Sequence, residues 1–153
     1  MIRAAIAEAR VFDSWLSYQE ALARAVAPLT EAQLRQRPLP GHRSIGEIAE
    51  HIVFGRALHL HRALGEKAHV LIPLLRWDAA GAAPRSATEI VQGLEATWQV
   101  LVEHVMCGAA TDDIPTSKET DSHVIWNLLD HDLPHAGQLS LLLRACGLPA
   151  LEV

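Results

Sequence analysis

Two histidines separated by one helical turn are the residues of this chain whose spacing points most directly to chemistry. His131 and His135 lie four positions apart in the segment HDLPHAGQ. In a helix of about 3.6 residues per turn, both imidazoles lie on one face, one above the other. Such a pair can supply two adjacent ligands of a transition-metal ion. The pair therefore predicts part of a metal site, provided that the chain brings a third ligand to the same face.

The residues around the pair indicate that this helix face is turned inward. Asn127, His135 and Gln138 all fall within about 40° of His131 around the helix axis. A solvent-facing stripe should not be flanked by large apolar residues, and a core-facing stripe should not carry polar groups without partners. We therefore expect a buried polar patch, in which Asn127 and Gln138 are candidates to hold the ligands by hydrogen bonds. The apolar residues that flank it are Val124, Leu128 and Leu142.

A third imidazole comes from an earlier helical segment. His51 shares a face with Glu47, one turn before it, and Gly55, one turn after it. Glycine inside a helix costs about 1 kcal/mol relative to alanine, and here it would leave open space beside the imidazole. Together with His131 and His135, His51 makes three nitrogen ligands. Three protein ligands and an open position are typical of catalytic zinc sites, whereas structural sites usually have four. Imidazole suits Zn, Ni, Cu or Fe.

Glu47 is the candidate catalytic residue, as a base or as an anchor near the metal. Its alternative role is structural, because Ser44 and Glu47 have the spacing of a helix-capping box. His51 also has a structural alternative, as a hydrogen-bonded histidine of the core. His59, about 80° from His51 around the helix axis, is expected at the edge of the site.

Helical periodicity and end signals predict an all-α protein. The chain contains four helical stretches, and the second and third each begin with a capping box, Ser44 with Glu47 and Ser86 with Glu89. About 20 residues, 65–85, separate these two helices, whereas antiparallel neighbours need only a few. We therefore expect a crossover between parallel helices, which gives a four-helix bundle of up-down-down-up order forming a single domain over residues 1–153. The expected helices are 2–26, 44–64, 86–108 and 122–146.

Composition excludes several other classes of protein. Half of the residues are apolar and the formal net charge is −5, so a basic surface for nucleic acid is not expected. No apolar run approaches the roughly 20 residues that span a bilayer. The N-terminal segment contains Glu8, Arg10 and Asp13 and lacks the apolar core of a signal peptide. With only two cysteines, read as ordinary reduced side chains, the chain is expected to be cytoplasmic.

The sequence resembles the DinB-like family of metal-dependent bundle proteins. The closing helix shares that family's His-x-x-x-His followed by Gly-Gln and, further on, Leu-x-x-x-Gly-Leu-Pro. The segment SIGEIAEHIVFG resembles the family's second helix, whose histidine is the first ligand. The resemblance implies an up-down-down-up bundle, metal ligands at His51, His131 and His135, and a homodimer. There are two departures from the family pattern. One is Pro134, and the other is Ala136, at a position where relatives often have arginine.

Two functions follow and stay open at this point. The first is a metal-dependent enzyme, a transferase or hydrolase-like protein, in which Zn, Ni or Fe activates a thiol or water for attack on a small-molecule substrate. The resemblance adds a low-molecular-weight thiol as a candidate co-substrate, because family members include thiol-dependent transferases. The alternative is a non-catalytic protein that binds a metal or small ligand for sensing, stress response or structure.

Overall fold

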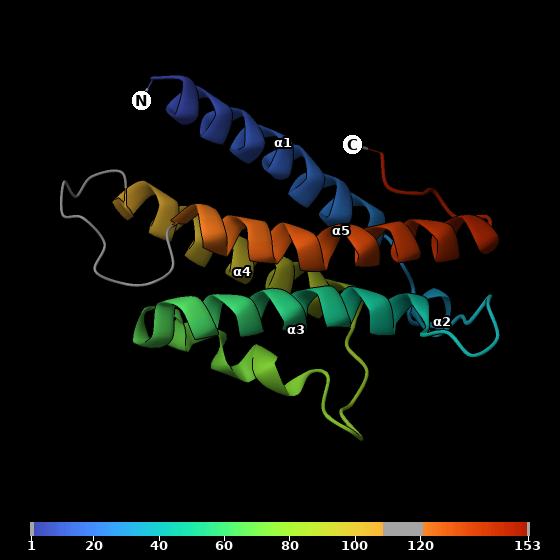
Figure 1. Cartoon of the computed structure of the whole chain (residues 1–153). Coiled ribbons are helices and arrows are strands. Elements are labelled where there is room, and N and C mark those ends of the chain that lie inside the picture. The colour runs from blue at the N-terminus through green and yellow to red at the C-terminus, as the bar shows by residue number, and fades with distance from the viewer. Residues whose placement is uncertain (1, 109–120, 153) are drawn as a thin grey trace.

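Long helices make up most of the computed structural model, which describes residues 2–108 and 121–152 (Figure 1). No strand occurs in these two ranges, and the predicted all-α class is confirmed. The elements are α1 (Ile2–Val26), α2 (Glu31–Leu34), α3 (Ile45–Leu64), the 3-10 helix η1 (Gly65–Arg76), α4 (Ala87–Gly108) and α5 (Asp121–Ala145).

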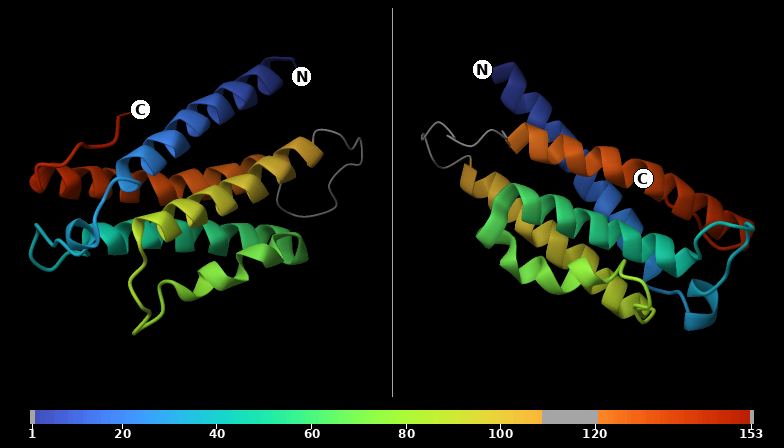
Figure 2. Two further views of the ribbon diagram at one scale, coloured as in Figure 1. Left: turned by 180° about the vertical axis from the view of Figure 1, so that it is seen from behind. Right: turned by 60° about the horizontal axis from the view of Figure 1, so that its bottom comes forward.

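The helix directions follow the predicted order. In Figure 1, α1 and α5 run one way along the bundle, while α3 and α4 run the opposite way. The two views of Figure 2 show the same arrangement, with the crossover returning along α3 before α4 begins. Helix α3 packs against α5, η1 and α4, and α1 packs against α4. The two helices that carry the three histidines, α3 and α5, are therefore direct neighbours.

Local hydrogen bonds define where the second and third predicted helices begin. At the start of α3, Ser44 Oγ accepts the Glu47 N–H at 3.1 Å, and the Glu47 carboxylate accepts the Ser44 N–H at 2.8 Å. Ser86 and Glu89 exchange the same two bonds before α4, at 3.2 and 2.9 Å. Both predicted capping boxes are confirmed. Gly65 ends α3 with a φ of 57°, in the left-handed region that favours glycine.

The crossover is more ordered than helical periodicity indicated. Residues 65–76 form η1, which is interrupted at Ala68 (φ −107°, ψ 19°) and contains Pro73. Ala68 and Leu71 are buried against the bundle, so this segment contributes to the core instead of only spanning it. The short helix α2 lies between the first two predicted helices, where no helix was expected, and Thr30 caps it. Both elements are short, so the helical pattern in their sequences is weak.

The core lies between the four long helices. Trp15, Leu22 and Val26 of α1 are buried. Cys146 is a free thiol, while the side chain of Cys107 lies outside the described residues. Among the helices of the described part, none is long and apolar enough to cross a membrane. That residues 1–153 form one domain stays a prediction.

Candidate metal centre

Three imidazoles from two neighbouring helices converge between α3 and α5. One ring nitrogen from each of His51, His131 and His135 lies within 4.8 Å of the other two. The ring centroids are 5.3 Å apart for His51 and His131, 4.6 Å for His51 and His135, and 4.7 Å for His131 and His135. Metal–nitrogen bonds of about 2.1 Å place two tetrahedral ligands about 3.4 Å apart. The three histidines could therefore hold one metal ion after small side-chain rotations.

Each of the three rings has an oxygen atom beside its Nδ1. A ring that donates its Nδ1–H to an oxygen presents the lone pair of Nε2 to a metal, and such partners orient the ligand. The bond from His135 is well formed, whereas the two carboxylate contacts at 3.4 Å are long for hydrogen bonds. The pairs are His135 with Gln138 Oε1 at 2.9 Å, His131 with Asp132 Oδ1 at 3.4 Å and His51 with Asp78 Oδ2 at 3.4 Å.

Gly55 makes the approach of the two helices possible at this point. A Cβ atom at Gly55 would lie only 1.9 Å from Cε1 and 2.3 Å from Nε2 of His131. The expectation that Gly55 leaves open space beside His51 is therefore corrected in one respect. The space exists, but the imidazole of His131 fills it. Its close packing on the α3 backbone fixes where this ligand sits.

A buried ion pair between Arg56 and Asp132 lies next to His131. Arg56 Nε donates to Asp132 Oδ2 at 2.5 Å, and both side chains are almost fully buried. Arg56 also donates to Gln19, and the hydroxyl of Tyr18 donates to the backbone oxygen of Asp132 at 3.4 Å. Burial raises the pKa of Tyr18 well above its ordinary value, so the phenol stays neutral. The network anchors the residue next to His131 to both α1 and α3.

Sequence reasoning missed Arg56 and Asp132. The signal was present, because each is a charged residue on a helix face that also carries core residues. Such residues are seldom fully buried unless they are paired. What could not be seen was that the two faces meet, since the residues lie 76 positions apart.

The segment after η1 supplies the oxygen beside His51. Asp78 accepts a hydrogen bond from Arg43 at 2.8 Å and lies 3.4 Å from His51 Nδ1. Burial, and then the positive charge of Arg43, lower the pKa of His51, while Asp78 acts in the opposite direction. A lowered pKa keeps the imidazole neutral at pH 7. The neutral form is the one that binds a metal.

The remaining predicted site residues occupy different positions. Glu47 lies in the capping box of α3 and pairs with Arg37, so its catalytic role stays a prediction. Asn127 is partly buried and Gln138 is exposed, so the polar stripe of α5 is less buried than expected around His135. Pro134 lies inside α5 without ending it. The ring of His59 lies 5.5 Å from that of His131, at the edge of the cluster.

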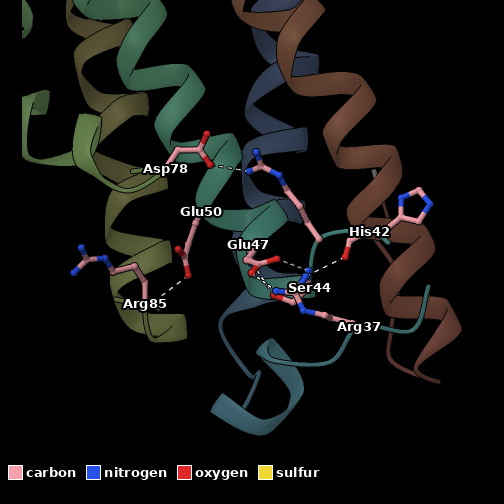
Figure 3. Close-up of polar contacts among 8 residues, drawn as sticks. Arg37, His42, Ser44, Glu47, Glu50, Asp78 and Arg85 are labelled. Atoms are coloured by element: carbon pink, nitrogen blue, oxygen red, sulfur yellow. Dashed lines mark hydrogen bonds and ion pairs between the residues drawn. The ribbon is translucent and has the colours of Figure 1, made fainter. Parts of the chain in front are cut away.

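A large cleft opens beside this centre. It has a volume of about 700 Å³ and is bounded by α2, the start of α3, the segment after η1 and the start of α4. The three histidines are not among its wall residues, but Arg43 and Asp78 are. Figure 3 shows Glu50 directed toward Arg85 in this region, where Glu50 accepts the Arg85 backbone N–H at 2.9 Å. Burial raises the pKa of Glu50, and that hydrogen bond opposes the rise.

Comparison with known proteins agrees with this architecture. The chain is similar to a crystal structure of a DinB-like protein from Bacillus cereus ATCC 10987, with a TM-score of 0.64 and 25% sequence identity. That similarity covers 94% of this chain and 95% of the other. The comparison with curated proteins found no match. The profile of the DinB superfamily matches residues 16–139, a range that includes both histidine-bearing helices except the end of α5. The chain therefore belongs to the DinB superfamily.

Proposed function

We propose that this protein binds one divalent transition-metal ion through His51, His131 and His135, and that the site activates a thiol or a water molecule. The observation that carries the proposal is the convergence of three ring nitrogens within 4.8 Å, each ring having an oxygen beside its Nδ1. Three imidazoles suit Zn, Ni or Fe. With three protein ligands, one coordination position is left for a reactant.

The chemistry that such an ion supplies is a lowered pKa of a bound thiol or water, which gives a nucleophile near neutral pH. The residues of this chain set the geometry. Gln138 and Asp132 accept the Nδ1 protons of His135 and His131, which would fix the tautomers and orientations of these two rings. The Asp78 carboxylate lies 3.4 Å from His51 Nδ1 without forming a hydrogen bond. The ion pair with Arg56 holds the Asp132 carboxylate in its buried position. A small-molecule substrate and a low-molecular-weight thiol fit this reaction class.

Glu47 is proposed as a base near the site. It lies one turn before His51 on α3, which supports a position close to a reactant. Its carboxylate is held by the Ser44 N–H and by Arg37. To accept a proton from a reactant, the carboxylate would have to leave the Arg37 ion pair.

A non-catalytic metal site is the second candidate. The observation that favours it is that the three histidines do not line the 700 Å³ cleft, and two of them, His51 and His131, have side chains only 17% exposed. A metal with little access to substrate would serve sensing or stability. The enzyme and the non-catalytic protein share the same ligands and differ in whether a reactant reaches the fourth position.

Metal analysis of protein purified without an affinity tag tests the site. Wild type is expected to hold about one metal ion per chain, and His51→Ala and His135→Ala are expected to lose it. His42→Ala, at an exposed position, is the matched control and should keep the metal. A metal-free wild type, or ligand variants that bind as well as the control, would show that the three-histidine site is wrong.

Activity assays separate the two candidates. A thiol-transfer screen with the Zn, Ni and Fe forms and several thiols should give turnover that His135→Ala abolishes. If the metal-loaded protein is silent throughout the screen, the non-catalytic function is favoured.

A further inference from the structure

The cleft beside the metal centre has an unbalanced set of charges. Four arginines and five carboxylates line it. Arg35, Arg37, Arg43 and Arg85 are each ion-paired with one of those carboxylates. This pairing uses four of the five acids and leaves Glu50. Arg85 pairs through its guanidinium with Glu89 at 3.5 Å, so its hydrogen bond to Glu50 comes from the backbone N–H.

Glu50 differs from the other carboxylates of the cleft in its burial. Glu50 is only 9% exposed, yet it forms part of the cleft wall. One oxygen, Oε1, accepts the Arg85 N–H at 2.9 Å. For the other oxygen, no hydrogen bond occurs within the described part of the chain. The positive charge of Arg85 acts on Glu50, but the ion pair of Arg85 is with Glu89, so Glu50 is largely desolvated without an ion pair of its own. That arrangement is costly, and a cation that enters the cleft would reduce the cost.

The rest of the wall indicates what the cation is attached to. Leu34, Trp77 and Pro84 contribute apolar surface to the same cleft. Each arginine is ion-paired with an acid, so a phosphate or a carboxylate in the cleft would have to compete with that acid. A ligand that suits these walls has one ammonium group and an apolar body of several carbon atoms.

From this combination, we propose that the cleft binds a small primary amine, with Glu50 as the anchor for its ammonium group. This site goes beyond the proposed metal centre and does not depend on it. The two are adjacent, because Asp78 lies in the cleft wall and 3.4 Å from His51 Nδ1. An amine in the cleft would therefore lie beside the metal centre, as part of a substrate would.

Binding of 2-phenylethylamine and of its N-acetyl derivative provides the test. The two probes share the same apolar body, and only the first carries a charge at pH 7. Saturation-transfer NMR and protein amide shifts are measured on the protein as purified and again after EDTA treatment, so that metal coordination by the amine is excluded. Wild type should bind the amine about tenfold more tightly than the amide, the range expected for one charge-assisted contact.

Two charge-matched variants assign the anchor. Glu50→Gln keeps the shape and an acceptor for the Arg85 N–H, and should weaken amine binding about tenfold. Glu20→Gln removes the same charge from an exposed, ion-paired carboxylate outside the cleft, and should change the affinity by less than about threefold. Circular dichroism checks that both variants are folded.

The proposal is overturned if the amide binds as well as the amine, if both variants weaken binding equally, or if neither probe shifts amides of the cleft. The comparison of the two probes needs only wild type, so the test remains decisive even if Glu50→Gln fails to fold. If wild type holds no metal but binds the amine, the proposed metal function alone is contradicted. If wild type holds the metal but does not bind the amine, this inference alone is contradicted.

Discussion

At the scale of single residues, the candidate metal centre depends on the absence of a side chain at position 55. His131 occupies the place where a side chain at position 55 would be, with its Cε1 only 1.9 Å from a Cβ built there. Helical glycine is unfavourable by about 1 kcal/mol, so its presence here needs a compensating contact. The packing of an imidazole directly on the α3 backbone is that contact.

Gly55→Ala is expected to displace His131 and to weaken metal binding at least about tenfold, as for loss of a positioned ligand. Gly137→Ala is the matched control, because a Cβ there meets nothing within 4 Å. That variant should keep the metal and gain about 0.5–1 kcal/mol of stability from helix propensity. Isothermal titration with zinc and urea unfolding measure the two effects. Equal zinc affinity in both variants would contradict the role given to Gly55.

The buried pair of Arg56 and Asp132 makes a separate prediction. Asp132→Asn leaves the Arg56 charge buried without its partner, so the free energy of unfolding should fall by about 3–5 kcal/mol. The double variant with Arg56→Met and Asp132→Leu removes both charges. Its loss of stability should be smaller than the sum of the losses caused by Arg56→Met alone and by Asp132→Leu alone. Urea unfolding of the single and double variants measures the coupling. Additive losses would show that the pair does not act as a unit.

At the scale of elements, the crossover has a second role besides connecting two parallel helices. η1 packs along α3, and the turn that follows it brings Asp78 to His51. The same turn forms a wall of the cleft. One segment therefore links the orientation of a metal ligand to the shape of the neighbouring cleft.

Asp78→Asn is expected to lower zinc affinity about tenfold, because His51 loses a charged oxygen beside Nδ1. Stability should change by less than about 1 kcal/mol, since the ion pair with Arg43 is partly exposed. Glu66→Gln, at an exposed position of the same crossover, controls for the loss of one negative charge. Zinc titration and thermal unfolding provide the two readouts. An unchanged zinc affinity in Asp78→Asn would show that Asp78 does not help to position His51.

At the scale of the whole molecule, a metal held by α3 and α5 would tie two helices together. Zinc in about 100-fold excess over its Kd should stabilise the native state by about 2.7 kcal/mol. The melting temperature should rise by several degrees and return to its starting value after EDTA treatment, and His51→Ala should show no rise. Differential scanning calorimetry tests this coupling of metal binding to the fold.

The same stabilisation should depend on pH. Protons compete for the imidazoles below the ordinary histidine pKa of about 6.5. The pKa of His51 is lowered by burial and by Arg43, so this ligand loses its metal-binding form only at lower pH than an ordinary histidine. The zinc-induced rise should persist at pH 7 and disappear as the pH falls toward about 5. A rise that is constant over this range would exclude histidine ligands.

Assembly stays a prediction. Trp126, Leu133 and Leu141 are large apolar side chains of α5 that are exposed to solvent, and this face is the candidate surface for the expected homodimer. Analytical ultracentrifugation of wild type and Leu133→Glu measures the mass, and a monomeric wild type would contradict the dimer.

Much of this protein could be predicted from sequence alone, because its strongest signals are local. Ser44 with Glu47 and Ser86 with Glu89 begin their helices as expected, since a capping box involves residues only three positions apart. The spacing of His131 and His135 places both rings on one face for the same reason. The long segment between two helices favoured parallel neighbours, which the bundle confirms.

Only the tertiary structure decided what surrounds those local features. Helical periodicity cannot show that Gly55 receives His131, that Arg56 meets Asp132, or that Asp78 reaches His51 from the crossover. Each contact joins residues far apart in the chain, so it depends on how two helices are rotated and shifted against each other. That geometry results from packing the whole core, and no single segment contains it. The sequence determined which histidines are present and how they are spaced, while packing determined how their rings are held.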